Sequence, residues 1–370
     1  MNIAVLIRSR TLSGAEKRAA KIARALESRG HQVICFMDAD TVTALIRDDY
    51  RFEWPPVVTL NYPQWLQTLS HGRSRLAGPR AWLGVNHLER WARRIFWRKL
   101  FYKYGIQVAH IYMKSEFCKN MPIPHIFEIT SPDMARTLIR QPDPFVPETL
   151  LHPNSESVDA VLHGFFPKNK KIVSPHAFFD PNEECVAYES EKENLVVFGH
   201  RLIERKNPVV FARAAKRFLE ARQNWRVAIR GAGEFADEVC RILTDEIDAG
   251  RAAFGYQANL MDELRKSKIF VSIESEDNYS NQSVLEAMWC RNALILSDRG
   301  NTRVRYFSEN GILCEPTEES VFEALMTLSA DQARINLAGE KSRRHVEKAF
   351  NREKYLEHLE GVYLEALQGV

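Results

Sequence analysis

Short apolar runs alternate with stretches of helical periodicity along most of the chain. Between residues 2–8 and 32–37, which read as strands, apolar side chains recur at helical spacing from Ala15 to Leu26, and Gly30 ends the helix. Further apolar runs of strand length lie at residues 106–112, 123–129, 149–152 and 172–174. This alternation predicts an α/β protein with doubly wound, parallel sheets.

The second half of the chain shows the same pattern most clearly. An apolar strand at residues 269–273 is followed by an acidic, amide-rich loop, a helix that opens between Ser280 and Ser283, and a second apolar strand at residues 292–298. Doubly wound sheets bind ligands at the carboxyl ends of their strands. The loop between the first strand and the helix is therefore a candidate ligand site.

The side chains of this loop suit a ligand that carries both phosphate and hydroxyl groups. The first turn of a helix leaves backbone N–H groups without partners, so an anion is well solvated there. Short polar side chains are added to that turn by Ser280, Asn281, Gln282 and Ser283. Four carboxylates could hold sugar hydroxyls, those of Glu274, Glu276, Asp277 and Glu286. A structural alternative stays open, in which Ser280 or Ser283 only caps the helix and the acids form a solvated loop.

A basic loop lies upstream in the same half. An apolar strand at residues 195–199 runs into Arg201, Arg205 and Lys206 before the next helix begins. Cations at the carboxyl end of a strand, opposite a helix N-terminus, would neutralise a diphosphate from two sides. The two loops together therefore predict a phosphate-binding site.

The length of the chain predicts two domains. Its 370 residues, with 45% hydrophobic and 27% charged side chains, fit about two globular domains. A polar, proline-punctuated stretch predicts a linker with the boundary near residue 185, so we expect domains at residues 1–185 and 186–350 and a terminal helix at 351–370. That helix carries an apolar stripe at Tyr355, Leu356, Leu359, Tyr363 and Leu367.

Composition and charge exclude several classes of protein. The formal net charge of +3 is too small to argue for nucleic-acid binding. The six cysteines lie far apart without a CxxC pair, which favours reduced thiols and argues against a zinc site. No stretch reaches about 18 consecutive apolar residues, and the first residues become charged too early for a secretory signal. We therefore expect a cytoplasmic protein without a transmembrane span.

Two motifs resemble those of a known family. The basic loop reads GxRLxxxKNP from Gly199, and the acidic loop is followed by LEAMxCxNALI from Leu285. This pair resembles the donor half of retaining glycosyltransferases with the GT-B fold, of the glycosyltransferase family 4 or "glycosyl transferases group 1" type. The resemblance implies two Rossmann-like doubly wound domains facing across a cleft, with the acceptor bound by the first and the donor by the second. It also implies that the terminal helix at residues 351–370 crosses back to the first domain. It implies transfer of a sugar from a nucleotide-diphosphate sugar to a glycan or lipid-linked acceptor, with retention and with no metal or other cofactor.

The resemblance also implies roles for particular residues. Arg201 and Lys206 would stabilise the leaving phosphate, and Glu276 or Asp277 would contact sugar hydroxyls. The implied donor-binding residues are Glu286 at the ribose, Tyr256 beside the base, and Gly14, Gly231, Gly233, Asn281, Gln282 and Ser283. The glycines would let the backbone approach the ligand closely.

The chain departs from the family pattern in both halves. Where the family has a His-Asp pair beside the transferred sugar, this sequence has Thr130 and Ser131, while His125 and Glu128 lie earlier on the strand. The first of the family's two glutamates in the acidic loop falls at Asn278. Two other functions therefore stay open: a non-catalytic subunit that binds a nucleotide sugar or a membrane and supports another enzyme, and a GT-B nucleotide-sugar epimerase or phosphorylase.

A basic and aromatic stretch spans residues 71–103. Lysines and arginines are interleaved there with tryptophan, phenylalanine and tyrosine, and Glu89 is the only acid. Such a helix can lie in a membrane interface against anionic headgroups, or it can pack on the first domain with a solvated basic face. The membrane interpretation implies a lipid-linked acceptor and peripheral contact at the inner face of the membrane. By resemblance to the family, we expect a role in surface polysaccharide or glycoconjugate synthesis.

Overall fold

The structure is a computed structural model in which the chain divides into two compact units. It describes residues 1–9, 14–47, 54–61, 79–142, 144–181, 191–257, 259–277 and 279–369. The first unit is Met1–His176 together with Glu353–Val370, and the second is Ala177–Arg352. The boundary predicted near residue 185 lies outside the described residues.

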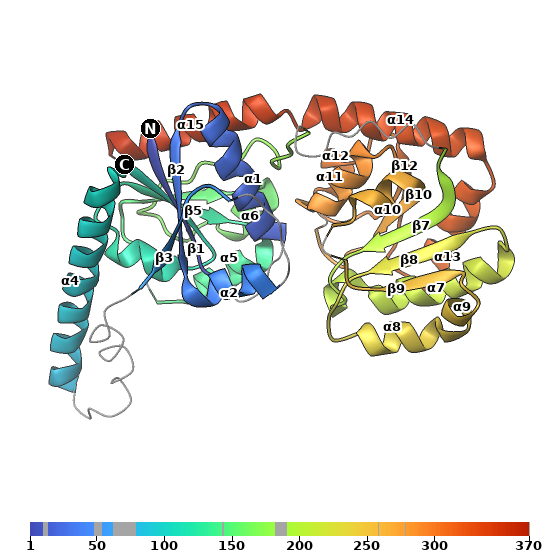
Figure 1. The fold of residues 1–370 in the computed structure, drawn as a ribbon, viewed down its shortest axis with the longest axis horizontal. Coiled ribbons are helices and arrows are strands. Elements are labelled where there is room, and N and C mark those ends of the chain that lie inside the picture. Colours follow the sequence, from blue (N-terminus) through green and yellow to red (C-terminus); the bar gives the residue numbers. More distant parts are fainter. Residues whose placement is uncertain are drawn as a thin grey trace. The chain divides into compact units, whose positions relative to one another are not determined.

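The first unit is built on a parallel sheet of six strands in the order β3-β2-β1-β4-β5-β6 (Figure 1). The strands are β1 (Asn2–Ile7), β2 (Gln32–Asp38), β3 (Val57–Leu60), β4 (Val108–Tyr112), β5 (His125–Ile129) and β6 (Thr149–Pro153). The helices are α1 (Gly14–Ser28), α2 (Ala39–Arg47), α4 (Pro79–Tyr104), α5 (Pro132–Ile139), α6 (Glu156–Val161), the short 3-10 helix η2 (Ser115–Asn120) and α15 (Arg352–Gln368). From Glu353 onward, α15 belongs to this unit.

The second unit is built on another parallel sheet of six strands, in the order β12-β11-β10-β7-β8-β9. The strands are β7 (Glu193–Gly199), β8 (Arg226–Arg230), β9 (Ala252–Gly255), β10 (Ser267–Ser272), β11 (Ala293–Ser297) and β12 (Gly311–Cys314). The helices are the 3-10 helix η4 (Glu204–Lys206), α7 (Pro208–Ala221), α8 (Ala236–Ile242), α9 (Thr244–Asp248), α10 (Met261–Lys266), α11 (Gln282–Trp289), α12 (Thr302–Arg305), α13 (Glu318–Ser329) and α14 (Gln332–Ala349).

Both sheets have the same topology when each is numbered from its own first strand. The strand order reverses between β1 and β4 in the first unit and between β7 and β10 in the second. The carboxyl ends of these central strands form the topological switch point, where open α/β sheets bind ligands. The structure thus confirms the predicted α/β architecture, and the loops after β7 and β10 are the two in which the sequence predicts a phosphate site.

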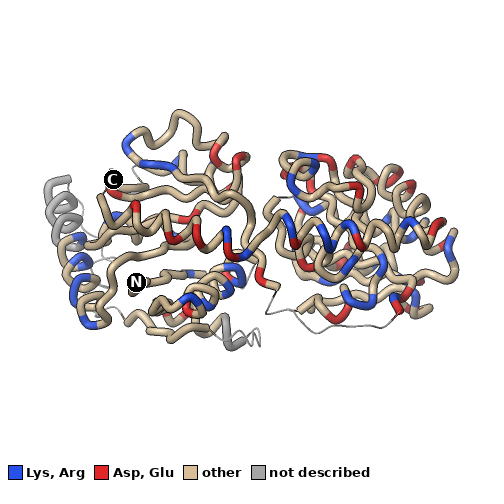
Figure 2. The backbone as a smooth tube through the Cα atoms, turned by 90° about the horizontal axis from the view of Figure 1, so that it is seen from above, with Lys and Arg blue, Asp and Glu red and all other residues tan. Residues whose placement is uncertain are grey.

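The helix α4 has one face in the core of the first unit and one face in solvent. Trp97 and Phe101 are buried against Phe36, with ring centroids 6.4 Å and 5.7 Å away. On the outer face, Trp91 is 63% exposed and Tyr102 is 90% exposed. Exposed basic side chains recur along this helix, at Arg90, Arg94, Arg98, Lys99 and Lys103. Figure 2 shows the basic positions of the chain in blue along the backbone. Within the described part of the chain, no helix combines the length and apolar character needed to cross a membrane.

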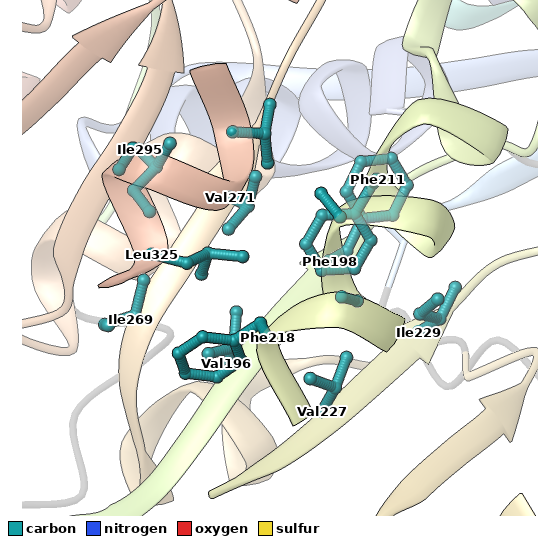
Figure 3. Packing of buried hydrophobic residues seen from close by; sticks show 14 of the residues in the cluster. Val196, Phe198, Phe211, Phe218, Val227, Ile229, Ile269, Val271, Ile295 and Leu325 are labelled. Atoms are coloured by element: carbon teal, nitrogen blue, oxygen red, sulfur yellow. The ribbon is translucent and has the colours of Figure 1, made fainter. Parts of the chain in front are cut away.

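Buried apolar side chains pack on both faces of the sheet in the second unit. Val196 and Phe198 of β7 pack toward α7, where Phe198 stacks on Phe211 with ring centroids 4.7 Å apart (Figure 3). Val197, between them on the strand, belongs to the apolar cluster on the other face. Because β7 is covered on both faces, its sequence is a continuous apolar run rather than an alternating one.

One predicted strand is absent, and one stretch without a clear pattern forms two elements. Residues 172–174 do not form a regular strand. Ile172 N donates to Leu151 O at 3.0 Å and Ser174 N donates to Pro153 O at 2.8 Å, but Pro153 has no N–H group to donate in return. The elements α2 and β3 lie between residues 39 and 60, where the pattern is irregular.

The terminal helix buries most of its predicted apolar stripe. Tyr355, Leu356, Leu359 and Tyr363 are fully buried, whereas Leu367 is 36% exposed. The helix is therefore held along its length except near its C-terminal end.

Candidate functional site

The loops after β7 and β10 meet at the switch point of the second sheet. Arg205 Nη1 donates to Glu274 Oε2 at 2.7 Å, and Lys206 Nζ forms an ion pair with Glu274 Oε1. Only 2% of the Glu274 side chain is exposed, compared with 25% for Arg205 and 11% for Lys206. Two cations of the basic loop are therefore gathered around one buried carboxylate.

Backbone and amide hydrogen bonds fix these two loops against each other. Asn207 ends η4 in the left-handed conformation, with φ at 50°, which asparagine adopts more readily than most residues. From there its Nδ2 donates to Ile273 O at 3.1 Å and to Ser275 Oγ at 3.0 Å. In return, Ser275 N donates to Arg205 O at 3.0 Å. The cations thus stand on a loop that is anchored to the end of β10.

The predicted glycine pair packs against protein backbone. A Cβ atom on Gly231 would lie 1.8 Å from His200 O, and one on Gly233 would lie 2.3 Å from Leu202 O. The loop after β8 can therefore approach the loop after β7 only without side chains at these positions. These glycines bring two loops of the site together, and the close approach to the ligand that the sequence suggested stays a prediction.

Asn281 caps the helix α11. Its Oδ1 accepts the N–H of Ser283 at 3.2 Å, so the capping residue is neither Ser280 nor Ser283, the two candidates suggested by the sequence. The Asn281 Nδ2 atom lies 3.3 Å from Ser272 Oγ and 3.4 Å from Glu274 Oε1. One amide side chain thus joins the start of α11 to the buried carboxylate.

The acidic side chains after β10 divide between a structural and an exposed position. Asp277 is 7% exposed, and its Oδ1 accepts the N–H groups of Tyr279 at 3.0 Å and Asn301 at 3.1 Å. This carboxylate therefore holds the loop together, while Glu276 is exposed to solvent. Of the two acids predicted to contact sugar hydroxyls, Glu276 is the accessible one. Asn278 lies outside the described residues.

Four further predicted residues lie at the same end of the sheet. Arg201 is exposed, just after β7, and Gln282, Ser283 and Glu286 are partly exposed on α11. The Gln282 Nε2 atom donates to Phe178 O at 2.9 Å. The structure therefore brings Arg201, Lys206 and the first turns of α11 to the ends of neighbouring strands.

Two predicted donor-binding residues lie outside the loops after β7 and β10. Tyr256 follows the edge strand β9 and is 57% exposed. Gly14 starts α1 in the first unit, where an added Cβ atom would meet nothing within 4 Å. Neither position contradicts a role in binding.

A buried histidine lies beside the cations. His200 Nε2 donates to Val271 O at 3.2 Å, and Asn281 Nδ2 lies 3.4 Å from its Nδ1. Burial, and then the positive charges of Lys206 and Arg205, hold the pKa of His200 well below its ordinary range. His200 is therefore neutral at physiological pH and adds no charge to the site.

In the first unit, the positions of the expected His-Asp pair form the start of a helix. Ser131 caps α5 by accepting the N–H of Met134 at 3.2 Å. His125 is buried and hydrogen-bonded to Ile123 O and Thr149 Oγ1, each at 2.9 Å, and burial lowers its pKa. His125 is thus a structural residue whose two ring nitrogens both have partners.

A second cluster of buried polar side chains, absent from the sequence predictions, joins α1, three strands and α15. Arg18 Nη2 pairs with Glu128 Oε1. Glu128 Oε2 accepts from His152 Nδ1 at 2.5 Å and from His110 Nε2 at 3.3 Å. The other ring nitrogen of His110 lies 2.9 Å from Tyr363 OH. We call these five residues the buried cluster.

The composition of the buried cluster raises the question of a metal ion. His110, Glu128 and His152 offer ligand atoms that all lie within 4.8 Å of one another. However, Arg18 already neutralises the carboxylate, so a divalent cation would add uncompensated charge among fully buried side chains. Both histidine nitrogens that face the carboxylate also already donate to it. The residues therefore fit a closed hydrogen-bond network better than a metal site.

Comparison with known families decides the class of this protein. Residues 183–352, most of the second unit, match the family described as Glycosyl transferases group 1. The second unit belongs to that family, and the chain is a glycosyltransferase. The matched residues include both loops of the candidate site. No curated protein sequence matches the chain.

Solved structures share the fold of this glycosyltransferase over nearly its whole length. A glycosyltransferase from Rickettsia africae is 13% identical, covers 99% of this chain and 98% of its own, and has a TM-score of 0.69. S. aureus TarM, in a complex with fondaparinux, α-GlcNAc-glycerol and UDP, is 11% identical over 98% of this chain and 99% of its own, with a TM-score of 0.74. Anabaena HepE, in a complex with UDP and glucose, is 14% identical over 99% of this chain and 100% of its own, with a TM-score of 0.72. Both Rossmann-like units are therefore those of the GT-B fold.

Proposed function

We propose that this glycosyltransferase moves a sugar from a nucleotide-diphosphate sugar to a glycan or lipid-linked acceptor, with retention of configuration and without a divalent metal. The observation that carries the proposal is the group of cations after β7, at the switch point and beside the start of α11. Arg201 and Lys206, predicted from the sequence to hold a phosphate, lie there together with Arg205. A diphosphate at this position would meet positive charge and a helix N-terminus at once.

The chemistry follows from the charges that develop when the sugar–phosphate bond breaks. Negative charge grows on the leaving phosphate and positive charge on the sugar ring. Arg201 and Lys206 would donate to the leaving oxygens and stabilise the negative charge that develops on them. These cations would take the place of a divalent metal in neutralising charge at the phosphate. Glu286 on α11 would hold the ribose, and the exposed Glu276 would contact sugar hydroxyls.

Two neighbouring structures suggest which donor to test first. S. aureus TarM and Anabaena HepE were each solved with UDP, and HepE also with glucose. We therefore propose a uridine-diphosphate sugar as the first candidate donor. In the test, the melting temperature of the purified protein is measured with UDP, GDP, ADP and CMP. One nucleotide at 100 times its dissociation constant should stabilise the fold by about 2.7 kcal/mol.

Matched variants locate the bound nucleotide. Lys206→Ala should abolish the stabilisation, whereas Lys216→Ala, on the outside of α7 and paired with Asp245, should retain it. Transfer that persists in EDTA would support the metal-independent mechanism. Loss of turnover in EDTA, restored by added Mg²⁺, would contradict it.

We further propose that the acceptor is lipid-linked and that the protein works at the cytoplasmic face of a membrane, in surface polysaccharide or glycoconjugate synthesis. The exposed face of α4 supports this, because cations and aromatic rings share it as they do in interfacial helices. Residues 71–78, at the start of the predicted basic stretch, lie outside the described residues.

A second candidate function is a non-catalytic subunit that binds a nucleotide sugar and supports another enzyme. It is favoured by Thr130 and Ser131 at the His-Asp positions and by Asn278 at the position of the first glutamate. Release of free nucleotide from a sugar nucleotide by the purified protein alone, lost on Lys206→Ala or Glu286→Ala, would argue against it. Nucleotide binding without any release would favour it.

A further inference from the structure

We propose that Glu274 is a positioning residue, whose two carboxylate oxygens hold Lys206 and Arg205 as a fixed cation pair for the donor diphosphate. This inference rests on the proposed function, because it takes a diphosphate to be the ligand of these cations. The sequence suggested that Glu274 contacts sugar hydroxyls, together with the other acids of its loop. In the structure this carboxylate faces the cations of the neighbouring loop.

The geometry separates Glu274 from an ordinary surface ion pair. Each carboxylate oxygen contacts a different cation, with Oε2 at 2.7 Å from Arg205 Nη1 and Oε1 paired with Lys206 Nζ. The Glu274 side chain is 2% exposed, so solvent screens these contacts much less than those of a surface pair. One carboxylate thus sets the distance between two neighbouring cations.

The backbone around Glu274 is fixed from a third element. Glu274 N donates to Ser297 Oγ at 2.8 Å, at the end of β11. Asn281, the cap of α11, lies within 3.4 Å of Glu274 Oε1. The carboxylate is therefore anchored to the sheet and to the helix whose N-terminus would face the phosphate. Residues held in this way keep binding groups close to a productive geometry.

The charge of Lys206 depends on this carboxylate. Burial lowers the pKa of Lys206, and the Glu274 carboxylate acts in the opposite direction. Arg205 and Arg201 lower the pKa further by repulsion, and the neighbouring His200 is neutral. Among the groups in the described residues that act on Lys206, Glu274 is the acid that favours the ammonium form.

The test measures the binding of UDP and of inorganic pyrophosphate to the purified full-length protein, from neutral to alkaline pH. Pyrophosphate reports on the diphosphate position whatever base the donor carries. We expect Glu274→Gln to bind both probes about tenfold more weakly at neutral pH, the effect of losing one charged hydrogen bond. Its remaining affinity should disappear at a lower pH than in the wild type, because Lys206 then loses its proton earlier.

A matched control separates the position of Glu274 from its charge. Glu204→Gln removes one negative charge from the exposed side of η4, next to the same cations. This variant should keep the wild-type affinity and the wild-type pH profile. A purely structural role of Glu274 would change the melting temperature but not the pH at which affinity is lost.

Three results would overturn the inference. If the wild type binds the probes and Glu274→Gln binds them equally well or more tightly with the same pH profile, the carboxylate is a bystander or a competitor of the phosphate. If the wild type binds neither UDP nor pyrophosphate, the proposed donor site fails and this inference fails with it. Should Glu274→Gln not fold, Glu274→Asp keeps the charge but shortens the reach, and should weaken binding about tenfold at every pH. Unchanged binding of both probes by Glu274→Asp would be the third result that overturns the inference.

Discussion

Arg18 and Glu128 form an ion pair with side chains that are 4% and 0% exposed, although the two residues lie 110 positions apart. Arg18 comes from α1 and Glu128 from β5. The second carboxylate oxygen holds His110 and His152 on the neighbouring strands. Because His110 also contacts Tyr363, one network ties the first helix, the sheet and the last helix of the first unit together.

The first prediction concerns the stability that this pair gives. Arg18→Ala leaves the Glu128 carboxylate buried without its counter-charge, so the free energy of unfolding should fall by about 3–5 kcal/mol. Urea unfolding followed by circular dichroism measures the change. Arg136→Ala is the control, since the Arg136–Asp133 pair is 41% and 54% exposed and should contribute at most about 1 kcal/mol. Equal effects of the two substitutions would show that the buried pair is not an important source of stability.

The second prediction concerns acid. Burial, and secondarily Arg18, lowers the pKa of His152 to about 3, and burial lowers that of the neighbouring His358 to about 4. Burial holds the pKa of His110 well below its ordinary range as well. In the unfolded chain these histidines bind protons near pH 6.5. Between about pH 4 and pH 6.5 the unfolded state therefore binds more protons than the folded state.

Stability should therefore be complete above about pH 6.5 and decline as the pH falls toward about 4, by up to about 1.4 kcal/mol per pH unit for each histidine. Unfolding midpoints measured at successive pH values give the slope. His152→Gln should flatten it, since glutamine binds no proton, whereas His163→Gln, at an exposed position, should leave it unchanged. A slope unaffected by His152→Gln would mean that other groups dominate the acid response.

The fold could be predicted from the sequence because its signals are local. The strands β7, β10 and β11 are buried on both faces, so each appears as an apolar run, and Arg201, Arg205 and Lys206 follow β7 directly. The order of strands in the sheet then places this loop beside the loop after β10. The position of the candidate site therefore follows from the pattern and the topology of the sheet alone.

The direction of individual side chains could not be predicted in this way. Glu274 and Asp277 belong to one acidic run, yet their partners differ. Glu274 pairs with Arg205, which lies 69 positions earlier in the sequence, whereas Asp277 accepts backbone N–H groups. The Arg18–Glu128 pair likewise joins elements that no local pattern connects. Such partners are chosen by tertiary packing, and the sequence carries no periodic signal for them.

The third prediction compares two glycines. In Gly231→Ala the new Cβ atom would meet His200 O at 1.8 Å, so the loop after β7 must move and stability should fall by about 1–3 kcal/mol. Gly361→Ala, on the exposed side of α15, meets no atom within 4 Å and should stabilise the helix by about 0.5–1 kcal/mol. Thermal unfolding gives both values, and nucleotide binding should weaken only in Gly231→Ala. Full binding by that variant would show that the loop position is not needed.

The fourth prediction separates the exposed cation from the buried one. Arg201→Ala removes an exposed side chain, so the free energy of unfolding should change by less than about 0.5 kcal/mol. Turnover with the donor should nevertheless fall by about a hundredfold or more, as expected for one lost donor to the developing charge. Arg213→Ala, an arginine on α7 whose side chain is 57% exposed, should change neither quantity. A normal rate in Arg201→Ala would remove that residue from the catalytic group.

The last prediction tests the outer face of α4 against a lipid surface. The protein should sediment with vesicles that contain phosphatidylglycerol, less so at high salt, and should not sediment with pure phosphatidylcholine. Each basic residue near an anionic surface contributes about 1 kcal/mol, so replacing Arg94, Arg98 and Lys99 together with glutamine should lower partitioning by about a hundredfold. The control replaces partly or fully exposed cations of the second unit, at Arg213, Lys216 and Arg226. If both triple variants bind the vesicles equally well, α4 is not the contact surface, and its basic face only faces solvent.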